Sequence, residues 1–525
     1  MAEARYDPTR VLTLAEAARY IRVSEKTLRE MAKQKRIPSQ KVGREWRFLL
    51  PALDAWLTGG NRPTAAEAPA PYEQQTLFEA DEQEIETARV TELEDSAFTR
   101  NRAEPLHRWV PWIAGFSAEF VGSVLDRITY RAPEDVLVLD PFAGVGTTLV
   151  EGFKRGHNVV GFEINPYAAL ACRVKLQAHT CSPDELPRCI TRFRQHMRTA
   201  LRSDRTRPAS RPPAAFLTRK PFFSPSVERQ VLFVLDYIDQ ERSAMAKDIF
   251  RIALGAVMVS FSNYSYEPSL STRAAAGRED ISEADVTSVL AQKLYEMSAD
   301  ICFLQRQISH LRQKPSALVY EGSFLKDHGA ALRKRSADVL ITSPPYLNNY
   351  HYIRNTRPQL HWLGLIDSTR TIKQMELDSF GKFWQTVRAA PEIGLDFENA
   401  QLAHTLSLIR AQNPHKGVYG GKGWANYAAT YFNDCNKFLT ITRNTMKPGG
   451  LVVVVIGNNI LQAVEVKAEE ILARMAESIG FRVLGMHVVR KKRTGTSIVN
   501  STVRAGVTSV RTELYETAVE LQAPH

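Results

Sequence analysis

Four short runs of apolar residues constrain the fold of this chain more than any other feature. They are Val136–Leu139, Val159–Phe162, Val339–Thr342 and Leu451–Ile456, and they are rich in β-branched side chains. Continuous apolar runs of this length are typical of parallel strands that are buried on both faces of a sheet. Helical patterns separate the runs, so the sequence predicts a wound α/β fold around a mostly parallel sheet.

Composition and charge exclude several classes of protein. The chain has 525 residues, 44% hydrophobic and 24% charged, which is typical of globular domains and not of disordered or collagen-like chains. Its net charge of +11 is compatible with a polyanionic partner. The five cysteines form no C-x-x-C pair, so we expect neither a disulfide framework nor a metal site. The sequence shows no signal peptide and no apolar run of membrane-spanning length, so we expect a cytoplasmic protein without a membrane partner.

The chain is predicted to contain a small domain, a linker and a large domain. Residues 8–58 form the small domain and are basic, with 12 Lys or Arg against 7 Asp or Glu in residues 1–57. Residues 59–98 are rich in Ala, Pro and Glu, which indicates an acidic flexible linker. Residues 99–525 form the α/β domain. Within it, a mostly helical insert over residues 181–315 and a second insert over residues 365–425 are candidate target-recognition regions.

The small domain has the pattern of a winged helix-turn-helix. Thr13 and Glu16 form a capping box at the start of the first helix. A tight turn leads to a second, basic helix over Ser24–Lys35. A basic hairpin over Gln40–Phe48 and a last helix through Trp56 follow.

The string from Leu12 to Leu57 resembles the excisionase/MerR-type DNA-binding domain. The resemblance implies contacts with the major groove and with the phosphates. The major-groove residues are Lys26, Thr27 and Arg29, and the phosphate-binding residues are Lys41, Arg44 and Arg47. A basic three-helix module for protein interaction is the alternative.

A glycine-rich loop follows the first apolar run of the large domain. The string is Asp140-Pro-Phe-Ala-Gly-Val-Gly-Thr-Thr148, and a helical pattern begins at Thr147. Gly144 and Gly146 permit a tight turn that directs backbone N–H groups at a ligand. The second run ends in Glu163, whose carboxylate suits the two ribose hydroxyls of an adenosine.

The whole string resembles motif I of the S-adenosylmethionine-dependent DNA amino-methyltransferases. The resemblance implies S-adenosyl-L-methionine as cofactor and a class I methyltransferase fold, which is Rossmann-like with a mostly parallel seven-stranded sheet. The residues that it implies around the cofactor are Asp140, Phe142, Ala143, Gly144, Gly146, Thr147, Thr148, Glu163 and Ile164. His107 and Phe116 lie in a stretch similar to motif X, for which a packing helix is the alternative. Ser323 and Phe324 lie at the position of motif III, where Ser323 replaces the usual Asp.

The third apolar run leads directly into Ser343-Pro-Pro-Tyr346. The two prolines stiffen the loop and remove two N–H donors, so its carbonyls are free to accept hydrogen bonds. An exocyclic amino group is a poor nucleophile because its lone pair is delocalised into the ring. Hydrogen-bond acceptors at the Ser343 hydroxyl and the Pro344 carbonyl would localise that lone pair. Positioning of the reactants and oriented dipoles would then lower the barrier to methyl transfer. Tyr346 offers an aromatic face for a base rotated out of the duplex.

This second string resembles motif IV of the same family, in which Pro344, Pro345 and their neighbours are catalytic. Ser before Pro-Pro-Tyr usually accompanies the N4 amino group of cytosine, so the resemblance implies a site-specific N4-cytosine DNA methyltransferase in restriction-modification or epigenetic marking. Carbon-5 methylation is disfavoured because none of the five cysteines follows a proline. An adenine-N6 enzyme, an RNA guanine-N2 enzyme and a regulator that only senses cofactor are the alternatives.

The remaining predictions concern partners. Val510–Glu520 and Phe481–Arg490 are predicted as a closing strand pair, joined by a basic loop. Lys491, Lys492 and Arg493 of that loop are candidates for DNA phosphate contacts, with a solvated hairpin tip as the alternative. Duplex DNA is the expected partner and the bacterial nucleoid the expected place. A cognate restriction endonuclease is a further candidate, and the sequence leaves monomer and homodimer open.

Overall fold

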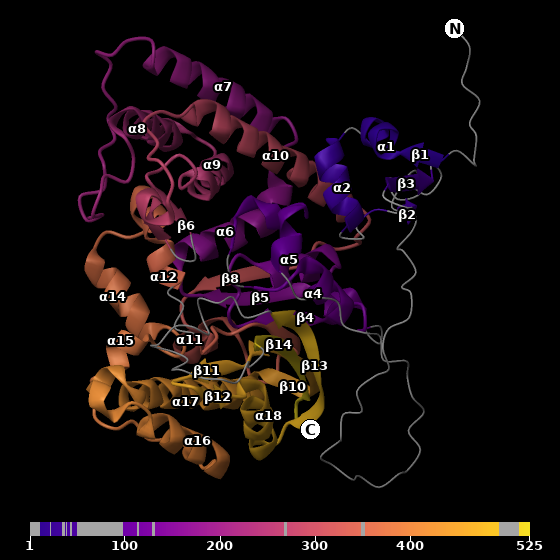
Figure 1. The fold of residues 1–525 in the computed structure, drawn as a ribbon, viewed down its shortest axis with the longest axis vertical. Coiled ribbons are helices and arrows are strands. Elements are labelled where there is room, and N and C mark those ends of the chain that lie inside the picture. The colour runs from indigo at the N-terminus through magenta and orange to yellow at the C-terminus, as the bar shows by residue number, and fades with distance from the viewer. Residues whose placement is uncertain are drawn as a thin grey trace. The chain divides into compact units, whose positions relative to one another are not determined.

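The computed structural model describes residues 11–21, 23–33, 37, 39–42, 45–49, 98–112, 115–128, 132–266, 270–347, 352–492 and 514–525. The chain divides into two compact units, Met1–Val90 and Thr91–His525. Figure 1 labels the helices and strands of both units.

The first unit has two short helices and a three-stranded sheet. Its elements are β1 (Val11–Thr13), α1 (Leu14–Tyr20), α2 (Glu25–Lys33), β2 (Gln40–Val42) and β3 (Glu45–Leu49), in the sheet order β1-β3-β2. The capping box is present, since the Thr13 N–H donates to the Glu16 carboxylate at 2.8 Å. Ser24 caps α2 by accepting from the Thr27 N–H at 3.1 Å. Leu28 on α2 is fully buried. The helices and the hairpin of the sequence prediction are therefore confirmed, β1 was not predicted, and the last helix lies outside the described residues.

A seven-stranded sheet forms the centre of the second unit, with the order β13-β14-β10-β9-β4-β5-β8. The strands are β4 (Leu137–Asp140), β5 (Asn158–Glu163), β8 (Ala317–Glu321), β9 (Ala337–Thr342), β10 (Met446–Gly457), β13 (Arg482–Lys492) and β14 (Leu514–Gln522). Only β14 runs against the others, pairing antiparallel with both β10 and β13. This is the mostly parallel seven-stranded sheet predicted for a class I methyltransferase, and the predicted fold class is confirmed.

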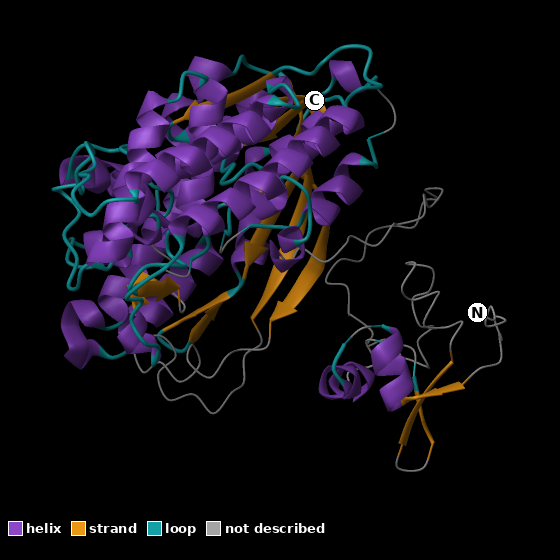
Figure 2. Ribbon diagram, turned by 90° about the horizontal axis from the view of Figure 1, so that it is seen from above, coloured by secondary structure: helices purple, strands orange, loops and turns teal. Residues whose placement is uncertain are grey.

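Helices cover both faces of the sheet, as Figure 2 shows. Val138 and Val339 point into one core together with α4 (Ala118–Leu125), α5 (Thr147–Lys154) and α6 (Pro166–Gln177). Leu139 and Leu340, one residue further along the same strands, point into the other core. That second core is formed with α11 (Phe324–Ala331), α16 (Ala400–Ala411), α17 (Gly421–Thr445) and α18 (Ala468–Ile479). Alternate residues of each strand thus face opposite cores, which explains why the runs are apolar throughout.

Two inserts interrupt the sheet. The first is helical, as predicted, and contains α7 (Glu185–Ala200), α8 (Pro225–Gln240), α9 (Ala244–Val257), α10 (Val286–Gln307) and the hairpin β6 (Tyr264–Tyr266)–β7 (Leu270–Thr272). After β9 come α12 (Tyr352–Asn355), α13 (Arg357–Trp362), α14 (Thr369–Asp378) and α15 (Trp384–Val387). The small hairpin β11 (Asn459–Leu461)–β12 (Val464–Val466) follows β10. Within the described residues, no helix is both long and apolar enough to cross a membrane.

Candidate active site

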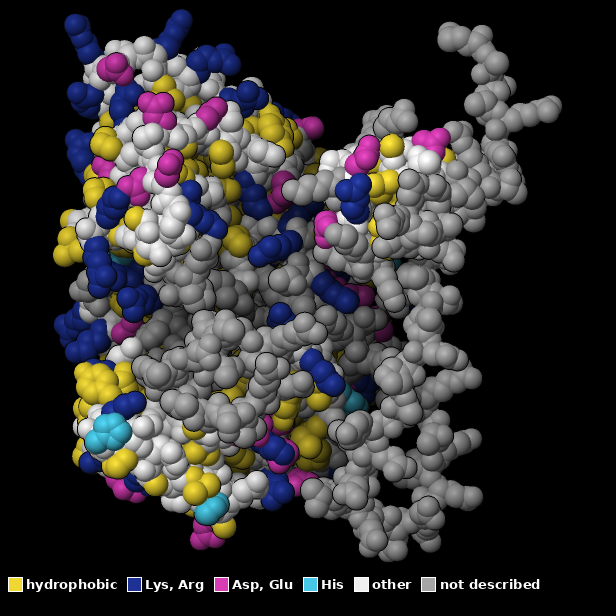
Figure 3. All heavy atoms as spheres, in the orientation of Figure 1, with side chains coloured by type: hydrophobic (Ala, Val, Ile, Leu, Met, Phe, Trp, Pro, Cys, Tyr) yellow, Lys and Arg dark blue, Asp and Glu magenta, His cyan; other side chains and the backbone are white. Residues whose placement is uncertain are grey.

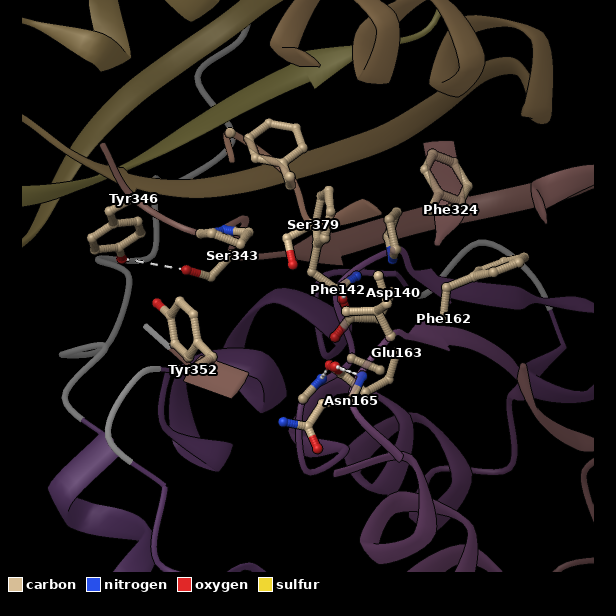
Figure 4. Close-up of a pocket in the computed structure, with 18 of the residues that line it drawn as sticks. Asp140, Phe142, Phe162, Glu163, Asn165, Phe324, Ser343, Tyr346, Tyr352 and Ser379 are labelled. Carbon is tan, nitrogen blue, oxygen red and sulfur yellow. Dashed lines mark hydrogen bonds between the residues drawn. The ribbon is translucent and has the colours of Figure 1, made fainter. Parts of the chain in front are cut away.

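A cavity of about 570 Å³ opens at the carboxyl ends of β4, β5, β8 and β9. Parallel strands end at one edge of the sheet, so the loops that follow them are brought together there. Figure 4 shows the side chains that meet in this cavity. The predicted residues that line it are Phe116, Asp140, Phe142, Ala143, Gly144, Thr147, Glu163, Ile164, Ser323, Phe324, Ser343, Pro345 and Tyr346. Both sequence motifs therefore contribute to a single cavity, whose size suits a small-molecule ligand.

The glycine-rich loop needs its glycines for different reasons. Gly146 precedes α5 with a φ of 87°, in the left-handed region. A Cβ placed there would lie 2.5 Å from the sulfur of Cys172. Gly144 has a φ of 52°, and its N–H donates to Glu163 Oε2 at 2.8 Å. The loop is thereby packed against α6 and tied to the end of β5.

Two carboxyl groups lie at the ends of adjacent strands, Asp140 buried and Glu163 partly exposed. Glu163 Oε1 accepts from the Asn165 N–H at 2.8 Å, so both of its oxygens hold backbone donors. Burial raises the pKa of Glu163 to about 7 despite these hydrogen bonds. Asp140 accepts from the Thr342 hydroxyl at 2.6 Å, and burial raises its pKa to about 6. Asp140 thus fixes the end of β9, from which the next loop departs.

The Ser-Pro-Pro-Tyr loop begins directly after β9. The Ser343 hydroxyl donates to the Tyr346 hydroxyl at 3.3 Å. Burial raises the pKa of Tyr346 well above its ordinary value, so the phenol stays neutral. Pro344 is buried and, unlike its neighbours, does not line the cavity. Since a hydroxyl has one proton and two lone pairs, donation to Tyr346 leaves the lone pairs of Ser343 as acceptors.

Three of the predicted cofactor residues lie outside the cavity lining. His107 is buried, and its Nε2 lies 2.8 Å from Glu151 Oε1, so a hydrogen bond ties it to the ion pairs that Glu151 forms with Lys154 and Arg155. The Thr148 hydroxyl donates to the carbonyl of Ile341 on β9. Gly146 faces Cys172 as described above. These three residues contact the protein interior and not the cavity. Their expected contact with a cofactor stays a prediction.

Several cavity residues were not found from the sequence. The turn Asp378–Phe383 lines the cavity, although the second insert was predicted only as a target-recognition region. Its Phe380 ring lies 5.0 Å from that of Phe142, edge to face. Tyr352 at the start of α12 and Tyr431 on α17 also line the cavity. Aromatic residues at such positions are more often part of a core, so no sequence signal distinguished them.

The motif III position is occupied in an unusual way. Ser323 has no carboxylate, but its hydroxyl donates to the Asp378 carbonyl at 3.3 Å. The neighbouring Phe324 ring packs edge to face on Phe162 at 5.3 Å between centroids, and both rings line the cavity. The second insert therefore lines the cavity beside two aromatic rings, at the position where the motif III resemblance led us to expect an acidic residue.

The predicted DNA-binding residues are only partly described. Thr27 and Arg29 are exposed on α2, and Lys491 is exposed at the end of β13. Arg44 and Arg493 lie outside the described residues, as do the side chains of Lys26, Lys41, Arg47 and Lys492. The expected contacts of all these residues with DNA stay predictions.

Comparison with known proteins identifies similar chains for both units. A family described as a helix-turn-helix domain matches residues 11–61. The chain is 22% identical to the Type II methyltransferase M.BsoBI of Geobacillus stearothermophilus over 76% of this chain and 83% of that protein. It is 22% identical to the Type II methyltransferase M.MvaI of Kocuria varians over 71% of this chain and 82% of that protein. It is 21% identical to the Type II methyltransferase M.AvaI of a Nostoc species over 74% of this chain and 81% of that protein. These relatives support a methyltransferase, and the matching family supports an N-terminal helix-turn-helix domain.

Among solved structures, an rRNA methyltransferase, aviRa from Streptomyces viridochromogenes, aligns with 83% of this chain and 96% of its own. The sequence identity is 9% and the TM-score 0.26, so this alignment carries no argument about function.

Proposed function

We propose that this chain is a DNA methyltransferase that transfers a methyl group from S-adenosylmethionine to the N4 amino group of cytosine in duplex DNA. One observation carries the proposal. The Ser343–Tyr346 loop lines the same cavity as the glycine-rich loop and Glu163. A nucleotide-type cofactor site and a clamp for a planar amino group therefore face one another across one cavity. The Type II methyltransferases to which the chain is similar support the same class.

The residues of the cavity fit S-adenosylmethionine. The positive φ of Gly144, which lines the cavity, brings backbone without a side chain to the ligand side of the loop, and Gly146 lets the other side of the loop pack closely on Cys172. Glu163 keeps lone pairs on both oxygens and suits the ribose hydroxyls. Phe162 and Phe324 offer aromatic faces for an adenine. When bound, this cofactor supplies the electrophilic methyl group.

The protein's own contribution to the reaction is positioning. The Ser343 hydroxyl, oriented by Tyr346, accepts one N–H of the target amino group. The Pro344 carbonyl accepts the other, which requires the loop to turn this carbonyl toward the cavity, since Pro344 does not line the cavity in the free chain. Both acceptors favour a more pyramidal nitrogen with a localised lone pair. Holding two reactants in line lowers the activation barrier by up to about 7–11 kcal/mol in ideal cases. No strong base is required, because the alkylated nitrogen is acidic and water can take its proton.

We prefer cytosine over adenine as the target because of the residue before Pro-Pro-Tyr. This residue is Ser343 here, as is usual for enzymes that methylate cytosine N4, whereas enzymes that methylate adenine N6 usually have Asp or Asn. An adenine-N6 enzyme with the same fold and site is the second candidate, and it rests on the same cavity. A regulator that only senses the cofactor is disfavoured, because it would have no use for the Ser343–Tyr346 loop. A restriction endonuclease partner stays a prediction, as does a place in the cytoplasm near the nucleoid.

A labelled-methyl assay tests the proposal. The full chain is incubated with S-adenosylmethionine tritiated in its methyl group and with plasmid DNA, and label in DNA is counted. We expect incorporation with the wild-type chain and a loss of at least about 100-fold with Pro344→Ala, given the weight of positioning. Cofactor affinity, measured by calorimetry, should stay within about twofold, since the Pro344 side chain does not line the cavity. No incorporation by a folded, cofactor-binding wild-type chain into any tested DNA would refute the proposal.

A further inference from the structure

An arginine-rich loop connects α7 and α8 in the first insert. Residues 201–224 contain six Lys or Arg residues and one Asp. Five of the cations, Arg202, Arg205, Arg207, Arg211 and Arg219, are exposed. Figure 3 shows Lys and Arg side chains along the margin of the molecule where Figure 1 places α7 and α8.

These five arginines lack acidic partners within the described part of the chain. The loop's remaining cation, Lys220, forms an ion pair with Asp280. The loop's single acid, Asp204, has its carboxylate 3.9 Å from the guanidinium of Arg229, which belongs to α8 and not to the loop. A solvated surface normally intersperses both signs of charge, so a stretch of unpaired guanidinium groups indicates an anionic partner.

The loop is held in one conformation by hydrogen bonds. The buried carboxylate of Asp236 on α8 accepts from the N–H groups of Ala209 and Ser210, at 2.9 and 2.7 Å. Arg229 donates to the carbonyls of Ser203 and Thr206, at 2.7 and 3.3 Å. A prearranged loop loses little conformational entropy on binding, so its charges can contribute more fully to affinity.

The loop is also connected to the catalytic side of the cavity. Asn263, next to β6, donates from its side chain to the Pro221 carbonyl at 3.0 Å. On the same hairpin, the Tyr266 hydroxyl donates to the Asn355 carbonyl of α12 at 3.0 Å. Tyr352, the first residue of α12, lines the cavity. A continuous path of bonded elements thus joins the loop to the site where the target base would enter.

A ring contact fixes the second half of the loop. Phe216 lies 5.3 Å from His361 of α13, between ring centroids. The next residue, Leu217, projects into solvent with 80% of its surface exposed. The packed ring and the exposed neighbour leave Leu217 and Arg219 on the outer side of the loop, where a partner surface would meet them.

We propose that loop 201–224 binds the phosphate backbone of the duplex DNA from which the target base is rotated. This inference rests on the proposed function and deepens it by naming a DNA-binding surface that the β6–β7 hairpin and α12 connect to the cavity. Guanidinium groups bind phosphate oxygens through paired N–H donors, and each phosphate neutralised releases counterions. The loop gives affinity and register but reads no base, because phosphate contacts carry no sequence information.

Substitution of three arginines tests the proposal. Arg202, Arg205 and Arg219 have no side-chain hydrogen bond within the described structure, so R202Q/R205Q/R219Q should leave the loop intact. The control is R333Q/K334Q/R482Q, which also removes three exposed cations. Arg333, Lys334 and Arg482 lie at the amino ends of β9 and β13, at the opposite edge of the sheet from the cavity. Both full-length variants are checked by thermal unfolding and cofactor calorimetry before DNA affinity is measured by anisotropy between about 50 and 200 mM salt.

We expect the loop variant to bind DNA more weakly and with a smaller salt dependence. The slope of log K against log salt should fall by about 0.9 for each phosphate that the loop no longer neutralises, so by up to about 2.7 units, with the control unchanged. A loop variant with the wild-type slope and affinity would overturn the inference while leaving methylation by the wild type as evidence for the proposed function. Equal decreases in both variants would also overturn it, because they would show a non-specific effect of net charge.

Discussion

The side-chain amide of Asn165 donates to the hydroxyl of Thr356 at 2.7 Å. Asn165 follows the strand that ends in Glu163, and its backbone N–H holds one oxygen of that carboxylate. The Thr356 hydroxyl in turn donates back into α12, to the Ile353 carbonyl at 3.1 Å. These bonds join the cofactor side of the cavity to the helix that begins with Tyr352, and the two halves of the site are thereby held in register.

Replacing Thr356 by Val should separate catalysis from cofactor binding. The variant keeps the shape of the side chain but leaves the Asn165 amide buried without its acceptor, which costs about 1–3 kcal/mol. We expect kcat to fall about 5- to 30-fold, as a loss of one or two kcal/mol would give. The cofactor dissociation constant should change by less than about threefold, because α12 and not Glu163 loses its support. Thr405→Val removes a comparable hydroxyl on the surface of α16 and serves as control. Equal decreases of kcat in both variants would contradict the account.

Tyr346→Phe tests whether the phenol orients Ser343. The variant keeps the aromatic face for the base but removes the acceptor of the Ser343 proton. That proton can then turn toward the target amino group, where it opposes the acceptor role. We expect about a 5- to 30-fold loss of kcat with KM for DNA little changed. Single-turnover methylation measures the step directly. A variant that keeps both the wild-type single-turnover rate and the wild-type KM for DNA would show that Tyr346 acts only through its ring.

Gly146→Ala should destroy the cofactor site through a clash and not through backbone strain alone. The new Cβ would lie 2.5 Å from the Cys172 sulfur, in addition to about 1–2 kcal/mol for a left-handed φ. Gly277 is the matched control, since its φ is 69° and nothing lies within 4 Å of a Cβ there. We expect Gly277→Ala to lower stability slightly with normal cofactor affinity. Gly146→Ala should weaken cofactor binding at least about tenfold, a loss of about 1.4 kcal/mol. Calorimetry measures the cofactor affinity of both variants. Equal cofactor affinities for Gly146→Ala and Gly277→Ala would contradict the packing argument.

Cofactor affinity should depend on pH through Glu163. Its pKa of about 7 means that the carboxylate takes up a proton as the pH falls through this value and becomes a weaker acceptor for ribose hydroxyls. We therefore expect the cofactor dissociation constant to rise as the pH falls through 7. The stability of the free protein should instead increase over the same fall in pH. The unfolded chain has the ordinary lower pKa, so between about 4.5 and 7 the native state binds the extra proton and gains stability as the pH falls.

Glu163→Gln provides the control for both trends. The variant should bind cofactor weakly. The pH dependence that remains in its cofactor affinity and stability should be that of Asp140, whose pKa is about 6. Calorimetry and thermal unfolding from about pH 5 to pH 8 measure the two quantities. A wild-type affinity that is flat across this range would contradict the role given to Glu163.

The four apolar runs predicted their strands because those strands are buried on both faces. β8 was not predicted, since it is an edge strand with exposed residues at Ala317 and Leu318. A related physical reason explains the missed part of the cavity. The turn Asp378–Phe383 reaches Phe142 only through the long connection between β9 and β10, and no local pattern encodes that contact. The motif residues, in contrast, follow strands directly, and parallel strands bring such residues together whatever lies between them.

His107 shows the limit of motif matching. Sequence alone did not distinguish a ligand contact in the stretch around it from the alternative of a packing helix. The structure places its ring against Glu151, which also accepts from Lys154 and Arg155. A histidine next to a buried carboxylate is satisfied within the protein, and burial lowers its pKa.

The most direct test of the account is the chemical identity of the modified base. DNA methylated by the full chain is digested to nucleosides, which are separated and identified by mass spectrometry against synthetic standards. The account predicts N4-methylcytosine, with at least about 100-fold less formed by the Pro344→Ala variant. N6-methyladenine as the sole product would contradict the role assigned to Ser343.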